Sequence, residues 1–87
     1  MTDEERSQTT AVAALYRFVR LDDYESMREP LLNFCKERGV KGTLLLAHEG
    51  VNGTISGGKT AIADVLSYLR SDERLTDLDC KFSYHEE

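Results

Sequence analysis

The chain is 87 residues long, which predicts one domain with a single core that buries about 60–65% of its unfolded surface. Its 16 acidic and 11 basic residues give a net charge of −5, which argues against nucleic-acid binding by bulk electrostatics but leaves room for a local basic patch. Its two cysteines match neither the spacing of a zinc site nor a disulfide framework. The sequence also shows no signal-peptide pattern and no apolar stretch long enough to span a membrane. We therefore expect a reduced, cytoplasmic protein.

The N-terminal stretch MTDEERSQTT is polar and has no apolar periodicity. We therefore expect residues 1–10 to be disordered and residues 11–87 to form the domain. The run Ala11–Val19 is apolar and aromatic. In an extended chain, Tyr16 and Phe18 would lie on one face and Leu15, Arg17 and Val19 on the other, which predicts the first strand.

A helix is predicted from about Asp23 to Arg38. Asp22 followed by Glu25 resembles a capping box with an aspartate cap, and Gly39 is a natural helix stop. Pro30 lies inside this segment and cannot donate its backbone hydrogen bond, so we expect a kink or a regular part that begins there. The apolar positions that recur at helical spacing are Tyr24, Met27, Leu31, Phe34 and Cys35.

The stretch Gly42–Gly58 predicts a β-hairpin, because two apolar, β-prone runs flank the polar loop His48–Gly53. Gly50 and Gly53 can take positive φ, and Asn52 tolerates the left-handed region, so the chain can reverse here. The sequence leaves open which pair of residues forms the turn.

A second helix is expected to open at residues 56–58 and to end near Arg70–Asp72. Its apolar stripe is formed by Ile62, Val65, Leu66 and Leu69. A last, half-buried strand follows, in which the apolar positions alternate with polar ones. These positions are Leu78, Cys80, Phe82 and Tyr84.

The order β-α-β-β-α-β predicts an α+β, ferredoxin-like fold, in which two helices cover one face of a four-stranded antiparallel sheet. The other face of the sheet is left open. We expect the following residues to be buried: Phe18, Phe34, Leu45, Leu66, Leu69 and Phe82.

The hairpin string GTLLLAHEGVNGTISG, residues 42–57, strongly resembles the N-terminal domain of the rhodanese-homology tRNA uridine hydroxylases, also known as rhodanese-related sulfurtransferases. The segments Tyr16–Val19, Arg28–Leu32 and Leu69–Asp72 fit the same family in the same order. The Glu-Gly-x-Asn-Gly-Thr core of the hairpin is the most specific motif.

This resemblance implies a part in the oxygen-dependent formation of 5-hydroxyuridine at the tRNA wobble position, carried out by a longer protein. The family's catalytic cysteine belongs to a rhodanese domain expected downstream, so no residue of this chain inherits a catalytic role and no cofactor is expected here. The chain would be an accessory domain that contacts tRNA or docks on the catalytic domain. One alternative is a purely structural module of a rhodanese-like sulfurtransferase. Another is a free-standing acylphosphatase-like enzyme, although Val19–Asp22 lacks the glycines that would shape a phosphate-binding loop.

The hairpin loop holds the first candidate binding site. His48, Glu49 and Asn52 form the densest polar cluster beside glycines, together with the backbone amides around Gly50 and Gly53. Such a cluster can bind an anion or present hydrogen-bond donors to a substrate. Glycine and asparagine are also what a tight hairpin needs, so a structural turn remains an equal alternative.

Arg17 and Lys81 form the second candidate binding site. In their strands they lie on the faces opposite Phe18 and Phe82. If the helices cover the aromatic face, both cations stand together on the open one, where a phosphate backbone or a second domain could dock. The alternative is that they are scattered, solvated charges.

Other motifs carry weaker predictions. Cys35 and Cys80 lie on apolar stripes, where a free cysteine is usually a core residue, and the spacing of cysteines and histidines does not support a metal site. The pattern G-x-x-x-x-G-K-T is met by Gly53–Thr60, but Thr54–Ser56 reads as strand. We therefore expect at most a loose anion contact at this helix start.

Overall fold

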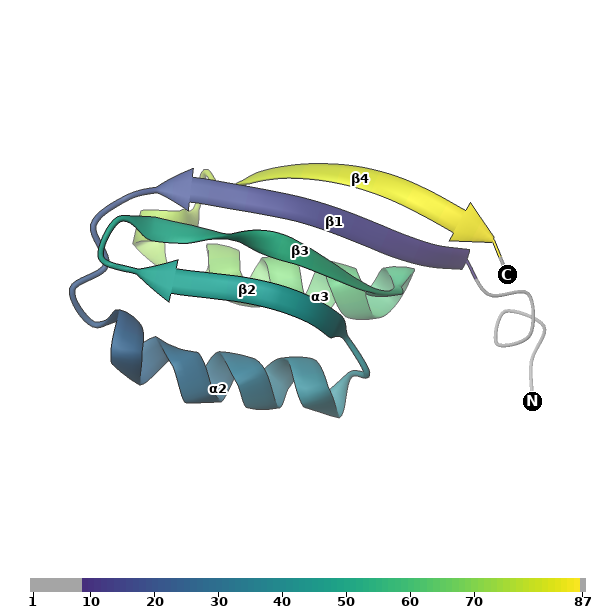
Figure 1. Cartoon of the computed structure of the whole chain (residues 1–87), viewed down its shortest axis with the longest axis horizontal. Helices are drawn as coiled ribbons and strands as arrows, with labels where there is room; N and C mark the ends of the chain where they lie inside the picture. Colours follow the sequence, from purple (N-terminus) through teal and green to yellow (C-terminus); the bar gives the residue numbers. More distant parts are fainter. Residues whose placement is uncertain (1–8, 87) are drawn as a thin grey trace.

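The structure, a computed structural model, describes residues 9–86 and has the predicted order of elements. The strands form one antiparallel sheet in the order β2-β3-β1-β4, and both helices lie against the same face of it (Figure 1). The α+β, ferredoxin-like prediction is therefore confirmed. The elements are β1 (Thr9–Phe18), α2 (Tyr24–Glu37), β2 (Lys41–Ala47), β3 (Gly50–Gly58), α3 (Lys59–Arg70), the short 3₁₀ helix η1 (Glu73–Leu75) and β4 (Asp79–Glu86).

The outer boundaries of β1, α2 and β4 hold to within about two residues, but the predicted loop His48–Gly53 is shorter in the structure, because β3 already begins at Gly50 and continues to Gly58. Residues 1–8 of the segment expected to be disordered lie outside the described residues. β1 begins at Thr9, so the last two residues of that segment belong to the strand. The helix η1 was not predicted. Among the described residues no helix is long and apolar enough to cross a membrane.

The start of α2 differs from the predicted capping box. Asp23, not Asp22, is the N-cap residue, and its side chain caps no backbone amide; its carboxylate instead accepts a hydrogen bond from Arg74 Nη1 at 2.6 Å. The helix runs through Pro30 without a break. Its end is as predicted, because Gly39 takes a φ of +70° and donates its N–H to the carbonyl of Lys36.

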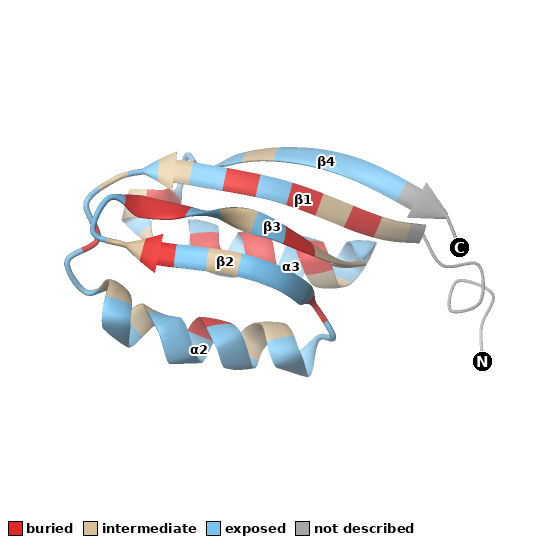
Figure 2. Ribbon diagram, in the orientation of Figure 1, coloured by how far each residue is buried: buried red, intermediate tan, exposed pale blue. Residues whose placement is uncertain are grey.

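The core lies between the helices and one face of the sheet. Along β1, buried and exposed residues alternate (Figure 2), with Ala11, Ala13 and Leu15 directed toward the helices. The stripe on α3 that was predicted from periodicity is also buried, Leu66 and Leu69 included. The largest fully buried side chains are Leu21, Ile62, Val65 and Leu75.

Three of the predicted core residues are exposed. Phe18 is 77% exposed and Leu45 58%, because both lie on the face of the sheet away from the helices. On the opposite side of β1, Ala11 and Ala13 are buried, and such small side chains allow helices to pack closely on a sheet. Phe82 does face the helix side, opposite Ala13, but β4 is an edge strand that α3 does not fully cover, and the ring stays 47% exposed.

Phe34, which was also predicted to be buried, is half-buried. It packs against the core and stacks on the ring of Tyr68 with 4.4 Å between the ring centroids. This ring contact joins α2 to α3. The guanidinium carbon of Arg38 lies 3.6 Å from the centroid of the Phe34 ring, which adds a cation–π interaction.

The two glycines of the hairpin motif are needed by the sheet backbone. Gly50 and Gly53 have φ values of +136° and +151°, which side-chain-bearing residues rarely adopt. A Cβ on Gly53 would lie 2.9 Å from Leu44 Cα and closer still to the carbonyl oxygen of Thr43, and one on Gly50 would collide with the carbonyl of Arg17. The reversal itself is made by the two residues between the strands, which are His48 and Glu49.

Candidate functional site

The hairpin tip is tied to the connection between β1 and α2. The carbonyl of Glu49 accepts a hydrogen bond from the N–H of Val19 at 2.9 Å, and the carbonyl of His48 accepts one from Leu21 at 3.0 Å. The imidazole of His48 meets the ring of Tyr24 edge-on, with 4.9 Å between centroids. The backbone of the tip is thus structural, whereas the side chains of His48 and Glu49 are exposed and free to meet another molecule.

The same hydrogen bonds argue against the acylphosphatase-like alternative. A phosphate-binding loop after β1 would need backbone N–H groups that converge on an anion. Here the N–H groups of Val19 and Leu21 donate instead to the carbonyl oxygens of the hairpin tip. The nearest arginine, Arg20, is exposed, and its Nε donates to Asp22 Oδ1 at 3.0 Å. Two of the backbone donors of this connection are therefore not directed at a possible anion.

The predicted loop cluster is only partly brought together. His48 and Glu49 lie at the tip, but Asn52 belongs to β3, where it pairs with Leu45 on one side and Tyr16 on the other. Asn52 is exposed on the face of the sheet away from the helices. The motif thus divides into two side chains at the tip, one on the sheet, and glycines that serve the backbone.

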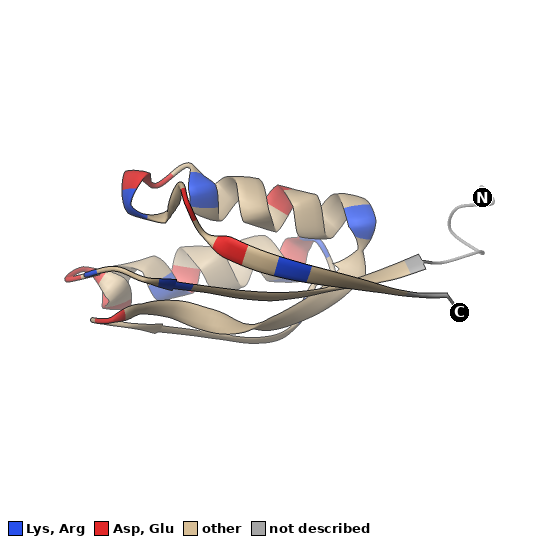
Figure 3. Cartoon of the chain, turned by 90° about the horizontal axis from the view of Figure 1, so that it is seen from above, with Lys and Arg blue, Asp and Glu red and all other residues tan. Residues whose placement is uncertain are grey.

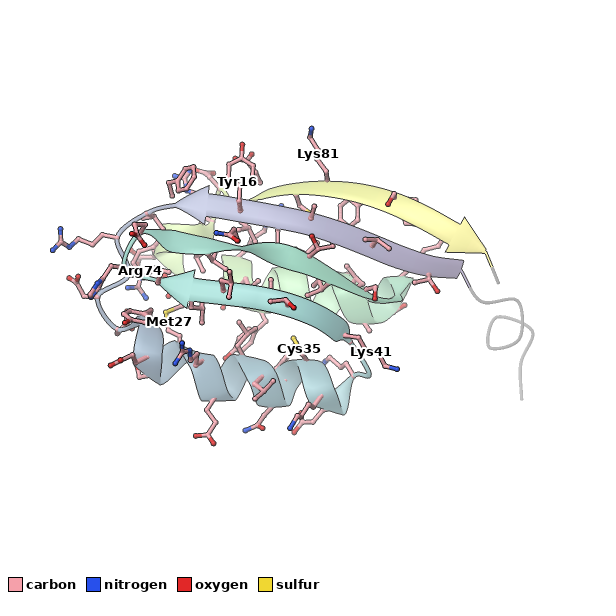
Figure 4. All side chains as sticks on the ribbon, in the orientation of Figure 1. Tyr16, Met27, Cys35, Lys41, Arg74 and Lys81 are labelled. Carbon is pink, nitrogen blue, oxygen red and sulfur yellow. The ribbon has the colours of Figure 1, made fainter. Side chains whose placement is uncertain are left out.

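Arg17 and Lys81 do not stand together, which corrects the second predicted site. Arg17 follows Leu15 on the helix side of β1; its Nη2 lies 4.0 Å from Asp77 Oδ2, and its Nε is buried without a hydrogen-bond partner among the described residues. Lys81 pairs with Ala14 on the other side of the sheet. Figure 4 shows Lys81 and Tyr16 projecting from β4 and β1 away from α2. The error has the same origin as the exposure of Phe18, namely the wrong choice of buried face for β1.

We call the side of the sheet away from the helices the open face. The large hydrophobic side chains that the register places there are Tyr16, Phe18 and Leu45, which are 47%, 77% and 58% exposed. The rings of Tyr16 and Phe18 are 5.8 Å apart between centroids. Sequence reasoning missed this pair because period-two alternation separates two faces without telling which one is covered.

The open face is poor in acidic groups compared with the rest of the chain. Among the described side chains, the register assigns it Lys41, Lys81 and Asp79. Most other charged positions lie on the helices and the connections, with Arg17 on the helix side of β1 as an exception (Figure 3). A chain with a net charge of −5 therefore keeps one face that does not repel an anion.

Both cysteines are half-buried free thiols. Cys35 lines a groove of about 500 Å³ between α2 and β2, and Cys80 lies on β4 against the core. Burial raises the pKa of both thiols, and this effect outweighs the opposing charges of Arg38 and Arg70. Within residues 9–86, no group of three or more His, Cys, Asp or Glu side chains is arranged to hold a metal ion.

The G-x-x-x-x-G-K-T pattern does not form a phosphate-binding loop. Thr54–Ser56 lies in β3, paired on both sides, and Gly58 is the N-cap of α3 with extended backbone angles. The ammonium of Lys59 lies 5.6 Å from the ring centroid of Tyr84. The pattern is therefore a strand followed directly by a helix.

A cluster that the sequence did not reveal surrounds Arg74. Its guanidinium is 2.6 Å from a carboxylate oxygen of Asp23 and 2.6 Å from one of Asp72. Hydrogen bonds from Arg74 lower the pKa of both carboxyl groups below their usual range. The cluster joins the start of α2 to η1, and Figure 4 places Arg74 at the same end of the molecule as Met27, so its ion pairs act as a structural clamp between these two elements.

Comparison with known proteins agrees with this picture. Residues 10–87 match the UPF0176 acylphosphatase-like domain. The chain is also 53% identical over 83 residues to a tRNA uridine(34) hydroxylase of Mesorhizobium japonicum. That alignment covers 95% of this chain but 27% of the relative, so the chain spans about a quarter of the length of the relative that it matches. The chain belongs to the UPF0176 acylphosphatase-like domain family.

Proposed function

We propose that this chain is the N-terminal accessory domain of a tRNA uridine hydroxylase, a longer cytoplasmic protein that forms 5-hydroxyuridine at the tRNA wobble position. The observation that carries the proposal is the 53% identity to a tRNA uridine(34) hydroxylase of which this chain spans only 27%. The chemistry would take place in a separate, rhodanese-type domain of the complete protein. The raised pKa values of both thiols in this chain support that division of labour.

Within this proposal, the domain contributes contacts to tRNA or to the catalytic domain. The tip side chains of His48 and Glu49 form one contact surface, and Asn52 and Lys81 form part of a second on the open face. Gly50 and Gly53 give the hairpin its shape. Arg17 would act separately from Lys81, on the helix side of the sheet near Asp77.

A purely structural module is the second candidate. Exposed Leu45 and Phe18 favour it, because apolar side chains on an uncovered sheet are also what a neighbouring domain would cover. The two candidates differ in whether the exposed side chains affect activity beyond their effect on stability.

The overall proposal is tested by the product. The complete protein, incubated with tRNA under oxygen, should form 5-hydroxyuridine at the wobble position, detected by mass spectrometry of nucleosides. The 87-residue chain alone should form none. Product formed by the 87-residue chain would contradict the accessory role, and no product with the complete protein would contradict the activity.

The contact role of the hairpin is tested by replacing His48, Glu49 and Asn52 together with alanine in the complete protein. Gly50 and Gly53 stay, and neither His48 nor Glu49 has a positive φ, so alanine can take their backbone angles in the turn. We expect the yield of 5-hydroxyuridine to fall while the melting temperature stays unchanged. Full activity would remove the hairpin from the contact surface.

A control variant replaces three exposed polar residues of α2 with alanine, a glutamate and an asparagine as in the hairpin and a lysine in place of the histidine. Glu29, Asn33 and Lys36 are exposed there, far from the hairpin tip in the sequence. Replacing them with alanine removes a similar set of polar groups and should leave the product yield unchanged. Equal losses in both triple variants would show that the effect is not specific to the hairpin.

A further inference from the structure

The open face presents two aromatic rings side by side on its central strand. Tyr16 and Phe18 lie two residues apart on β1, with ring centroids 5.8 Å apart and ring planes inclined by 57°. Each exposes about half or more of its surface. In RNA-recognition modules with a four-stranded sheet, aromatic side chains on the exposed face stack on unpaired bases.

A hydrogen-bonding group lies beside the stacking surface. Asn52 is the direct cross-strand partner of Tyr16, so its amide lies next to any base that stacks on that ring. An asparagine amide offers one acceptor and two donors, which suits the mixed donor and acceptor edge of a nucleobase. Lys81, one strand away on β4, adds a cation near the same row.

The charge on the open face also suits a polyanion. Lys41 and Lys81 stand there against the single carboxylate of Asp79, although the whole chain carries 16 acidic residues. Proteins that bind single strands combine aromatic platforms with a basic track for the backbone. The two lysines lie on opposite edge strands, β2 and β4, and offer two separate backbone contacts, so binding should be weak by itself and dependent on salt.

From this arrangement we propose that the open face is a stacking platform for unpaired bases of a single-stranded RNA loop. Tyr16 and Phe18 carry the bases, and Asn52 bonds a base edge. That the RNA is the anticodon loop of tRNA rests on the function proposed above. A docked protein domain fits less well, because polar Asn52 separates Leu45 from Tyr16, whereas the core of a protein interface is usually apolar and depleted of charge.

The test measures RNA binding by the complete protein, independently of hydroxylation. The probe is a fluorescent anticodon stem-loop with uridine at the wobble position, compared with the same stem as a continuous duplex. Tyr16→Ala and Phe18→Ala should each weaken stem-loop binding by roughly 5- to 150-fold, the loss expected for one stacked base, and leave duplex binding unchanged. Tyr16→Phe keeps the ring and should bind like the wild type.

Two further variants serve as controls. Tyr84→Ala removes an exposed ring, 56% exposed, from the helix side of the sheet and should not change binding. Asp79→Asn removes the carboxylate next to Tyr16 and should tighten binding at low salt, with the gain shrinking as salt is added.

The outcomes separate this proposal from the proposed function. If the wild type does not bind the stem-loop, or if Tyr16→Ala and Phe18→Ala bind it as the wild type does, the stacking platform is overturned even where 5-hydroxyuridine is still formed. If those variants bind normally but lower the melting temperature of the complete protein, a docked domain covers the face instead. If they lose binding while the wild type forms no 5-hydroxyuridine, the platform stands and the assigned activity fails.

Discussion

Exchanging two glycines of β3 for serine should give opposite results, because their surroundings differ. Gly53 has a φ of +151°, and a Cβ there would lie 2.9 Å from Leu44 Cα. The strained backbone costs about 1–3 kcal/mol, and each sheet hydrogen bond lost as β2 moves away costs about 0.5–1.5 kcal/mol. We therefore expect Gly53→Ser to reduce the free energy of unfolding by about 2–5 kcal/mol, a large part of the total for a small domain.

Gly58 is the matched control. A Cβ there would meet no atom within 4 Å, its φ is −64°, and it is the N-cap of α3, a position that serine favours by a few tenths of a kcal/mol. Gly58→Ser should therefore leave stability unchanged or slightly higher. Urea unfolding of the 87-residue chain, followed by far-UV circular dichroism, measures both variants. A loss below about 1 kcal/mol for Gly53→Ser would refute the close approach of β2 and β3.

Three further predictions follow from the core, the thiols and the clamp. Leu66→Ala should cost about 2–5 kcal/mol in the same unfolding assay, since the side chain is 4% exposed, and a cost under about 0.5 kcal/mol would contradict its burial. Both cysteine thiols should react with a disulfide reagent at mildly alkaline pH more slowly than a small free thiol, because burial raises their pKa values and lowers the thiolate fraction; equal rates would mean that they are accessible and ionised. The carboxyl groups of Asp23 and Asp72 have pKa values lowered in the fold by Arg74, so their stabilising effect is present at neutral pH and is lost as acid protonates them. The urea midpoint should fall with acidification less steeply in Arg74→Gln than in the wild type, and parallel curves would contradict the clamp.

Much of the fold could be predicted because its signals are local. Leu66 and Leu69 lie on a stripe with helical period, Gly39 ends a helix, and β-prone runs flank the hairpin loop. Each of these is decided by neighbouring residues, and the order of the elements then leaves few compact arrangements.

The side of the sheet that became buried could not be predicted in the same way. Alternation along β1 puts Phe18 and Arg17 on opposite faces whichever face is covered, and hydrophobicity alone favoured the aromatic side. The face of β1 that is buried carries Ala11, Ala13 and Leu15, whereas Phe18 on the other face is 77% exposed, and small side chains allow a helix to pack closely on a sheet. The candidate site inherited this inversion, since the cation expected beside Lys81 belongs to the opposite face.

The position of β1 has a consequence for the order of folding. β1 is the first strand of the chain, but its two neighbours, β3 and β4, come later, and Thr9 finds its partner only at Glu86. The hairpin can close early through local contacts, whereas the sheet needs loop closure over nearly the whole chain, which slows folding. During synthesis, one edge of β1 would stay unpaired until β4 has left the ribosome. In a chain truncated before Asp79 that edge would stay unpaired permanently and could promote aggregation.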